Sequence, residues 1–178
     1  AHMANDSAMC EAFSSGADIH TSTAAQVFGM PIDMVTPVMR SRAKAVNFGI
    51  VYGISDFGLA EQTGIKRKEA KQYIDQYLEE YHGIKVFMSE IIEIAKQKGY
   101  VETIFGRRRY IPEMQSSNYM VRKFGERAAM NTPIQGTAAD IMKMAMVETA
   151  RRLEEENLKA KIVLQIHDEL LIEAPEEE

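Results

Sequence analysis

Two cationic and two aromatic side chains recur at steps of four residues near the middle of the first half of the chain. They are Arg40, Lys44, Phe48 and Tyr52. On an α-helix each step of four drifts by only about 40°, so these side chains share one broad face. Cations at the N-terminal end of a helix add to its positive dipole and free N–H groups, which suits a polyphosphate. The rings can stack against a base, so the pattern favours a nucleotide-binding helix. The alternative is a solvated stripe with two half-buried rings.

A second polar set, Arg127, Asn131 and Gln135, also stands at steps of four. Pro133 interrupts this spacing, and the pair Thr132-Pro133 predicts that one helix ends here and another begins. Arg, Asn and Gln side chains can reach base edges and sugars in DNA. The set is therefore a candidate DNA contact, and the alternative is capping and solvent contact at a helix junction.

Two apolar, β-branched segments near the C-terminus flank a short polar turn. Residues 161–173 predict a hairpin with His167 and Asp168 at its tip and Glu169 beside them. Hard divalent cations prefer carboxylate oxygens, so Asp168 is a candidate metal ligand. A His-Asp pair also occurs in metal phosphohydrolases, but such a site needs further histidines, and the others in this chain have no obvious ligand spacing.

Capping signals predict the elements that must position these residues. Thr36 before Pro37 is a helix start, and Gly53 ends the helix that carries the four-residue pattern. Asp18 predicts the cap of a helix that passes Ala24, Ala25 and Val27 and stops at Gly29. Further helices are expected over residues 54–63, 66–81 (stopped by Gly83), 84–98, 116–131 and 132–156, and a hairpin over residues 100–111.

Apolar periodicity predicts which faces of the later helices are buried. In residues 84–98 the expected inward side chains are Val86, Phe87, Ile91, Ile94 and Ala95. In residues 132–156 they are Ile134, Ala138, Ile141, Met142, Ala145 and Val147.

Length and composition fit one ordinary domain, with 178 residues of which 46% are hydrophobic. The sequence has no run of about 18 apolar residues, so no membrane span is expected. The single Cys10 excludes an internal disulfide and fits a reducing compartment. Residues 1–3, Ala-His-Met, resemble a cloning scar.

The net charge of −5 is unevenly distributed. Residues 36–130 hold 16 Lys and Arg against 11 Asp and Glu, and the rest of the chain is strongly acidic. A basic middle allows phosphate binding on one face, although solvated helix faces explain most individual charges. The triple arginine at residues 107–109 is expected to be a solvated turn, and phosphate contact there stays open.

Three segments resemble motifs of the family A DNA polymerases. Residues 36–53 (TPVMRSRAKAVNFGIVYG) are similar to motif B, the fingers helix that binds the incoming dNTP. Residues 127–140 (RAAMNTPIQGTAAD) are similar to a second signature of the family, and residues 165–175 (QIHDELLIEAP) to motif C. The motifs occur in family order over nearly the whole chain, so together they are far more specific than any one of them.

The resemblance implies a role for the dNTP-binding residues. His20, in a segment similar to the stretch upstream of motif B, would contact the triphosphate together with Arg40 and Lys44. Lys44 would also neutralise the leaving group and is counted as catalytic. Phe48 and Tyr52 would pack against the sugar and the nascent base pair.

The resemblance also implies the DNA and metal contacts. The residues placed along the primer–template minor groove are Arg127, Asn131 and Gln135. His167 would help to position the primer end. Asp168 would bind the catalytic Mg²⁺, and Glu169 would assist at the same site.

The implied fold is mainly α with small β-hairpins (α+β). Residues 4–120 are expected to form the fingers, and residues 121–178 a partial palm with the motif C hairpin. Motif A is not recognisable, since Asp6 and Asp18 have the wrong context, and two-metal transfer needs carboxylates from both sides. The isolated chain is therefore expected to be inactive, and the alternative is a non-catalytic nucleotide- or DNA-binding module. The resemblance implies a bacterial cytoplasmic protein at the nucleoid, and a free hairpin edge allows a dimer.

Overall fold

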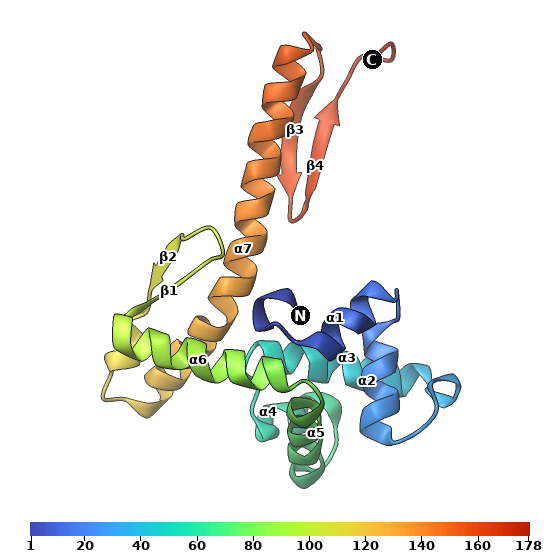
Figure 1. Cartoon of the computed structure of the whole chain (residues 1–178), viewed down its shortest axis with the longest axis vertical. Coiled ribbons are helices and arrows are strands. Elements are labelled where there is room, and N and C mark those ends of the chain that lie inside the picture. Colours follow the sequence, from blue (N-terminus) through green and yellow to red (C-terminus); the bar gives the residue numbers. More distant parts are fainter.

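The computed structural model describes the backbone of residues 1–178 and every side chain except that of Val27. A helical body is built from α1 to α6, and the long helix α7 projects from it with the hairpin β3–β4 beside its far end (Figure 1). The elements are η1 His2–Ala4, α1 Ser7–Ser14, α2 Ile19–Phe28, η2 Ile32–Met34, α3 Pro37–Val51, α4 Asp56–Thr63, α5 Arg67–Glu80, α6 His82–Lys98, β1 Tyr100–Glu102, β2 Arg108–Tyr110, η3 Pro112–Gln115, α7 Tyr119–Glu155, β3 Lys161–Ile166 and β4 Glu169–Glu173. The expectation of a mainly helical fold with small antiparallel hairpins is confirmed.

The first helices begin and end at the residues that the capping signals indicate. Thr36 Oγ1 accepts a hydrogen bond from the backbone N–H of Met39 at 3.3 Å, which satisfies one of the free donors of α3. The Asp18 carboxylate does the same for the first turn of α2. Gly29 ends α2 with a φ of 63°, a left-handed conformation that glycine adopts without steric strain. The expected core position Val27 has a side chain that lies outside the described residues.

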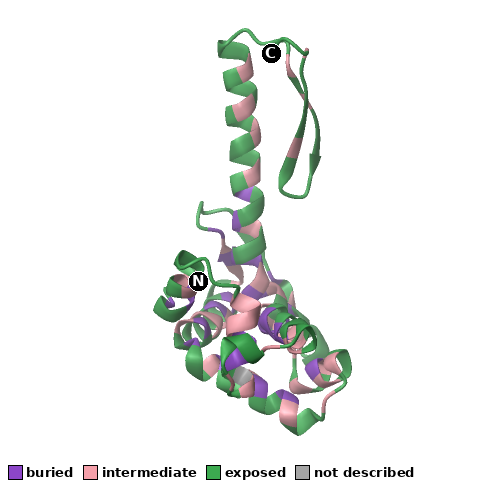
Figure 2. Cartoon of the chain, turned by 90° about the vertical axis from the view of Figure 1, so that its right-hand side faces the viewer, coloured by how far each residue is buried: buried purple, intermediate pink, exposed green. Residues whose placement is uncertain are grey.

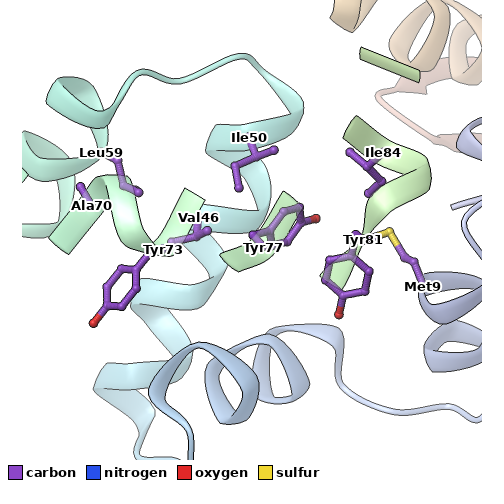
Figure 3. Close-up of a cluster of buried hydrophobic side chains, with 9 residues drawn as sticks. All are labelled: Met9, Val46, Ile50, Leu59, Ala70, Tyr73, Tyr77, Tyr81 and Ile84. Atoms are coloured by element: carbon purple, nitrogen blue, oxygen red, sulfur yellow. The ribbon is translucent and has the colours of Figure 1, made fainter. Parts of the chain in front are cut away.

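A first hydrophobic core joins α3 to α5, and to the ends of α1, α4 and α6 that meet it (Figure 3). Its buried members are Met9, Val46, Ile50, Leu59, Ala70, Tyr73, Tyr77, Tyr81 and Ile84. Rings of Tyr77 and Tyr81 lie 4.8 Å apart between centroids. This packing fixes one side of α3, so the opposite side of the helix is free to face solvent.

A second core lies where α6, the hairpin β1–β2 and the first half of α7 meet. It consists of Ile91, Ala95, Val101, Ile111, Met114, Ala129 and Met130. The hairpin is also tied to α7 through Arg107, whose Nε lies 2.6 Å from Asp140 Oδ1 and whose Nη2 donates to the Gly136 carbonyl at 2.9 Å. Arg107 of the triple-arginine turn therefore has a structural role, because it holds the hairpin against α7.

Helix α7 runs without a break through Pro133, so the expected junction at Thr132 is wrong. Thr132 Oγ1 donates to the Ala128 carbonyl at 2.6 Å, a bond within the helix, instead of capping a new one. An interior proline costs about 3 kcal/mol in a helix. Here Pro133 is fully buried, and its packing between neighbouring elements offsets that cost.

Several expected core positions are exposed. The second half of α7 projects beyond the helical body (Figure 2), so the side chains of Ile134, Ala138, Ile141, Ala145 and Val147 face solvent, and Met142 is half-buried. On α6, Val86 and Ile94 are exposed as well, because the helix turns Ile84, Ile91 and Ala95 inward. Periodicity identifies apolar faces, but it carries no information about which faces find a partner.

Gly83 does not stop a helix, contrary to the expectation, but lies in the first turn of α6. The chain breaks instead at Tyr81, with φ −101° and ψ 67°. A Cβ on Gly83 would approach the Ala4 carbonyl oxygen to 2.8 Å, so a larger residue does not fit. The Gly83 N–H donates to Asp6 Oδ2 at 2.9 Å, which fastens the N-terminal segment to α6.

Candidate functional site

Helices α2 and α3 pack against each other (Figure 1). An ion pair joins their N-terminal ends. Arg40 Nε lies 2.5 Å from Asp18 Oδ2, and both side chains are about half exposed. The hydrogen bond from Arg40 holds the pKa of Asp18 well below its ordinary value, although partial desolvation opposes this shift. The carboxylate that caps α2 therefore also orients the first cation of α3.

Lys44 and Phe48 continue the same surface one and two turns further along α3. The Lys44 Nζ lies 5.9 Å from the centroid of the Phe48 ring, and that ring is 49% exposed. The imidazole of His20 reaches the ring from α2, with 5.7 Å between centroids. The structure thus brings Arg40, Lys44 and Phe48 onto one exposed face of α3, as their spacing predicts, and His20 reaches the same face from α2.

A buried asparagine lies behind this face. Asn47 is 8% exposed, and its Nδ2 lies 2.9 Å from His20 Nδ1. Its Oδ1 accepts a hydrogen bond from the Thr23 hydroxyl at 3.1 Å. Sequence reasoning missed both Asn47 and Thr23; the available signal was an amide among the apolar positions of α3, where a polar group needs a partner.

The surroundings of His20 disfavour its charged form. Burial lowers the pKa of the imidazole below 6.5, and the positive charges of Arg40 and Lys44 lower it further, while Asp18 acts in the opposite sense. The lowered pKa favours the neutral form of the His20 imidazole.

Tyr52, the last member of the four-residue pattern, connects α3 to α7. It is the C-terminal cap of α3, and its hydroxyl accepts a hydrogen bond from Gln135 Nε2 at 3.1 Å. Next to it Gly53 has a φ of 68°, and a Cβ there would lie 3.1 Å from Arg127 Cγ. The polar set on α7 therefore adjoins the end of α3, and the unbroken helix keeps its members on one face.

Asn131 stands between Arg127 and Gln135 and has an unusual environment. Its Oδ1 is buried and accepts no hydrogen bond from the described residues. A buried amide oxygen without a donor carries a desolvation penalty of about 1–3 kcal/mol. Such an oxygen is suited to accept a bond from a group that approaches this face of α7.

The hairpin β3–β4 presents its acidic turn to solvent. Ile166 pairs with Glu169, which leaves His167 and Asp168 as a two-residue turn, and all three polar residues are exposed. The turn points back toward the helical body in both views (Figures 1 and 2). The oxygens of Asp168 and Glu169 suit a hard cation. Among the described side chains, however, no three His, Cys, Asp or Glu residues converge, so this set by itself does not form a metal site.

Comparison with known proteins identifies the family. All of residues 1–178 match the model of DNA polymerase family A. The chain belongs to this family. It is 57% identical over 178 residues to DNA polymerase I of Bacillus subtilis and 56% identical to that of Geobacillus stearothermophilus. Each alignment covers 100% of this chain and 20% of the relative, so the chain spans about a fifth of the length of these polymerases.

A solved structure shares the fold. It is described as the POL domain of Pol1 from M. smegmatis in complex with DNA primer–template and dNTP. The TM-score is 0.91 and the identity 44%, and the match covers 98% of this family A chain and 31% of the other.

The family match includes the first three residues, and these are part of the fold. The segment η1 packs on α6, and His2 and Met3 line an apolar pocket of about 380 Å³ together with Met130. The interpretation of residues 1–3 as a cloning scar stays a prediction. In the described part of the chain, no helix is long and apolar enough to cross a membrane.

Proposed function

We propose that this chain is the nucleotide-selecting part of a DNA-directed DNA polymerase that adds dNTPs to a primer 3′-OH in replication and repair. In this proposal residues 4–120 are the fingers and residues 121–178 part of the palm. The observation that carries the proposal is the convergence of His20, Arg40, Lys44 and Phe48 on the exposed face of α2 and α3. Family membership supports it, as does the structural relative solved with primer–template and dNTP.

The cations of α3 bind the triphosphate of the dNTP. Lys44 is exposed and forms no ion pair with any described carboxylate, so its full charge is available to the phosphates. As pyrophosphate leaves, Lys44 neutralises the charge that develops on it. Phe48 and Tyr52 pack against the sugar and the nascent pair, where their exposed rings provide flat apolar surface.

The polar face of α7 contacts the primer–template in the minor groove. The residues are Arg127, Asn131 and Gln135. Minor-groove acceptors are nearly the same for all base pairs, so contacts of this kind check pair shape and not sequence. The bond between Gln135 and Tyr52 links this face to the nucleotide helix. His167 positions the primer end from the tip of the hairpin.

Asp168 is the proposed ligand for Mg²⁺, with Glu169 beside it. The chemistry that bound Mg²⁺ would supply there is activation of the primer hydroxyl and stabilisation of the leaving oxygen, as in two-metal nucleotidyl transfer. The contribution of this chain is the carboxylate at a turn whose backbone geometry is set by the β3–β4 register. Since no third ligand converges on it in the described residues, we expect the 178-residue polypeptide alone to bind nucleotide or DNA without catalysis.

The test is an isosteric change of the acidic turn in the complete polymerase. Asp168→Asn is expected to abolish primer extension with Mg²⁺ and dNTPs while primer–template binding is retained. Glu173→Gln is the matched control, because Glu173 is an exposed carboxylate at the opposite end of the same hairpin. Full primer extension by Asp168→Asn would exclude the metal role, and equal losses in both variants would indicate a damaged hairpin.

A further inference from the structure

Asn47 is a buried polar residue of α3. It lies on the buried side of α3 between the core residue Val46 and the exposed Phe48, yet its amide points at α2 and not into the core. Both of its polar atoms have partners from α2: Thr23 Oγ1 at 3.1 Å and His20 Nδ1 at 2.9 Å. The amide therefore connects a hydroxyl that is fully buried to an imidazole that is half-buried.

The chemistry of the three groups determines where the imidazole proton lies. The Thr23 hydroxyl donates to Asn47 Oδ1, and the NH₂ group of Asn47 faces His20. An amide nitrogen can only donate, so His20 Nδ1 must accept with its lone pair. A neutral imidazole that accepts at Nδ1 carries its proton on Nε2. Nε2–H is then the only polar hydrogen of the ring, available to a group outside the protein.

We propose that Asn47 is a positioning residue that holds His20 as the neutral Nε2–H tautomer, so that the ring donates one hydrogen bond to a phosphate oxygen of the incoming dNTP. This inference rests on the proposed function of His20 in triphosphate binding. It assigns to Asn47 no contact with the nucleotide itself. Its effect is to prevent Nδ1 from carrying the proton, since that tautomer would present a lone pair at Nε2 and repel the anionic phosphate.

The charged groups around His20 are consistent with a neutral ring. Asp18 on its own helix faces Arg40, and Arg40 and Lys44 on α3 are both cations, so burial and these charges together lower the pKa of His20. The other elements packed against α2 contribute Glu11 from α1, Asp33 from η2 and Glu80 from α5. Of these, Glu80 is bound to Gln26 near the opposite end of α2, at 3.0 Å.

Asn47→Asp reverses which ring nitrogen of His20 is favoured to carry the proton, and it does not change the shape of the side chain. The new carboxylate keeps the oxygen that accepts from Thr23, but its second oxygen accepts where the amide donated. It therefore draws a proton onto His20 Nδ1 and raises the pKa of the imidazole. Below the new pKa the ring is an imidazolium and still donates from Nε2. Above that pKa the proton stays on Nδ1, and Nε2 becomes an acceptor.

The experiment is a pH profile of dNTP use by the complete polymerase carrying Asn47→Asp. KM for dNTP and kcat are measured from about pH 6 to about pH 9, each as a ratio to the wild-type value at the same pH. We expect the KM ratio to rise about tenfold or more toward high pH, the size of effect produced by losing one charge-assisted hydrogen bond. The kcat ratio and the primer–template Kd are expected to change little.

Asn47→Leu and His20→Ala complete the design. Asn47→Leu keeps the branching at Cγ with somewhat larger volume and lets either tautomer form, so its KM ratio is expected to be raised and flat with pH, provided that thermal unfolding shows a folded protein. His20→Ala tests the underlying role and is expected to raise KM at every pH. A flat KM ratio for Asn47→Asp, with His20→Ala still impaired, would overturn the tautomer proposal alone. An unchanged KM in His20→Ala would overturn the proposed role of His20 itself.

Discussion

Lys44 and Arg40 have the same charge and lie on the same face of α3, but the structure predicts unequal effects on nucleotide use. Lys44 forms no ion pair with the carboxylates that the structure describes, whereas Arg40 is bound to Asp18 at 2.5 Å. A charge-assisted hydrogen bond contributes about 1.5–3 kcal/mol. At about 1.4 kcal/mol per factor of ten, Lys44→Ala should lower kcat/KM for dNTP by roughly 10- to 150-fold.

Arg40 must weaken its bond to Asp18 before it can bind a phosphate. An ion pair as exposed as this one is weak, and its small contribution is subtracted from what Arg40 gains from the nucleotide. The loss in Arg40→Ala should therefore be up to about fivefold smaller than the loss in Lys44→Ala. Asp18→Asn removes the competing charge and should reduce this difference only if the cap of α2 is retained, as an Asn side chain allows.

The assay is single-nucleotide incorporation by the complete polymerase, with kcat/KM for dNTP and the Kd for primer–template measured on the same preparations. Lys85→Ala is the control, because Lys85 is an exposed lysine on α6 remote from α3 in sequence and without an ion pair among the described residues. Both α3 variants should keep the wild-type Kd for DNA. If Arg40→Ala is the more damaging variant, or if DNA affinity falls as much as dNTP use, Lys44 does not have the larger share in nucleotide binding.

Three further predictions concern the sugar contact, the backbone and the hairpin. Phe48→Tyr should improve use of dideoxynucleotides relative to dNTPs, because a phenol supplies the hydroxyl that the terminator lacks; an unchanged incorporation ratio removes Phe48 from the sugar pocket. Gly53→Ala should lower the free energy of unfolding by about 2 kcal/mol, since φ is 68° and the new Cβ would meet Met130 Cε at 2.3 Å; an unchanged denaturation midpoint contradicts this. The 178-residue polypeptide should form dimers through the free edge of β4, and Leu171→Lys should reduce them in sedimentation equilibrium; a monomer at all concentrations argues against edge pairing.

Local sequence signals predicted the helix boundaries well where a capping residue determines them. Thr36-Pro37 and Thr132-Pro133 show the limit of such signals, because the same dipeptide starts α3 but lies inside α7. At Thr36 the hydroxyl accepts from a backbone N–H of the next turn. At Thr132 it donates to a carbonyl of the preceding turn, and Pro133 is enclosed by packing that a sequence window does not contain. Tertiary packing therefore keeps Thr132-Pro133 inside α7 despite its local preference for a helix start. Thr36-Pro37 starts α3, as that preference predicts.

The residues of the candidate site that share one helix could be predicted from their spacing in the sequence. His20 was found through resemblance and not through periodicity, since it reaches Phe48 from another helix. The partnership of Asn47 with Thr23 could not be predicted, because it is a contact across 24 positions that only the packing of α2 on α3 creates. The same holds for Arg107, whose carboxylate partner lies 33 positions away on α7.

The two parts of the candidate site differ in what holds them in place. Lys44 lies on a helix whose other side is anchored by Val46 and Ile50 in the first core and by Asn47 against α2, so its direction is set within the helical body. Asp168 lies at the turn of a two-stranded hairpin whose strands are largely exposed, and such a hairpin is marginally stable by itself. Nucleotide affinity should thus be a local property of α2 and α3, whereas the placement of the metal ligand depends on whatever covers β3–β4. Substitutions that loosen the hairpin should consequently impair catalysis before they impair dNTP binding.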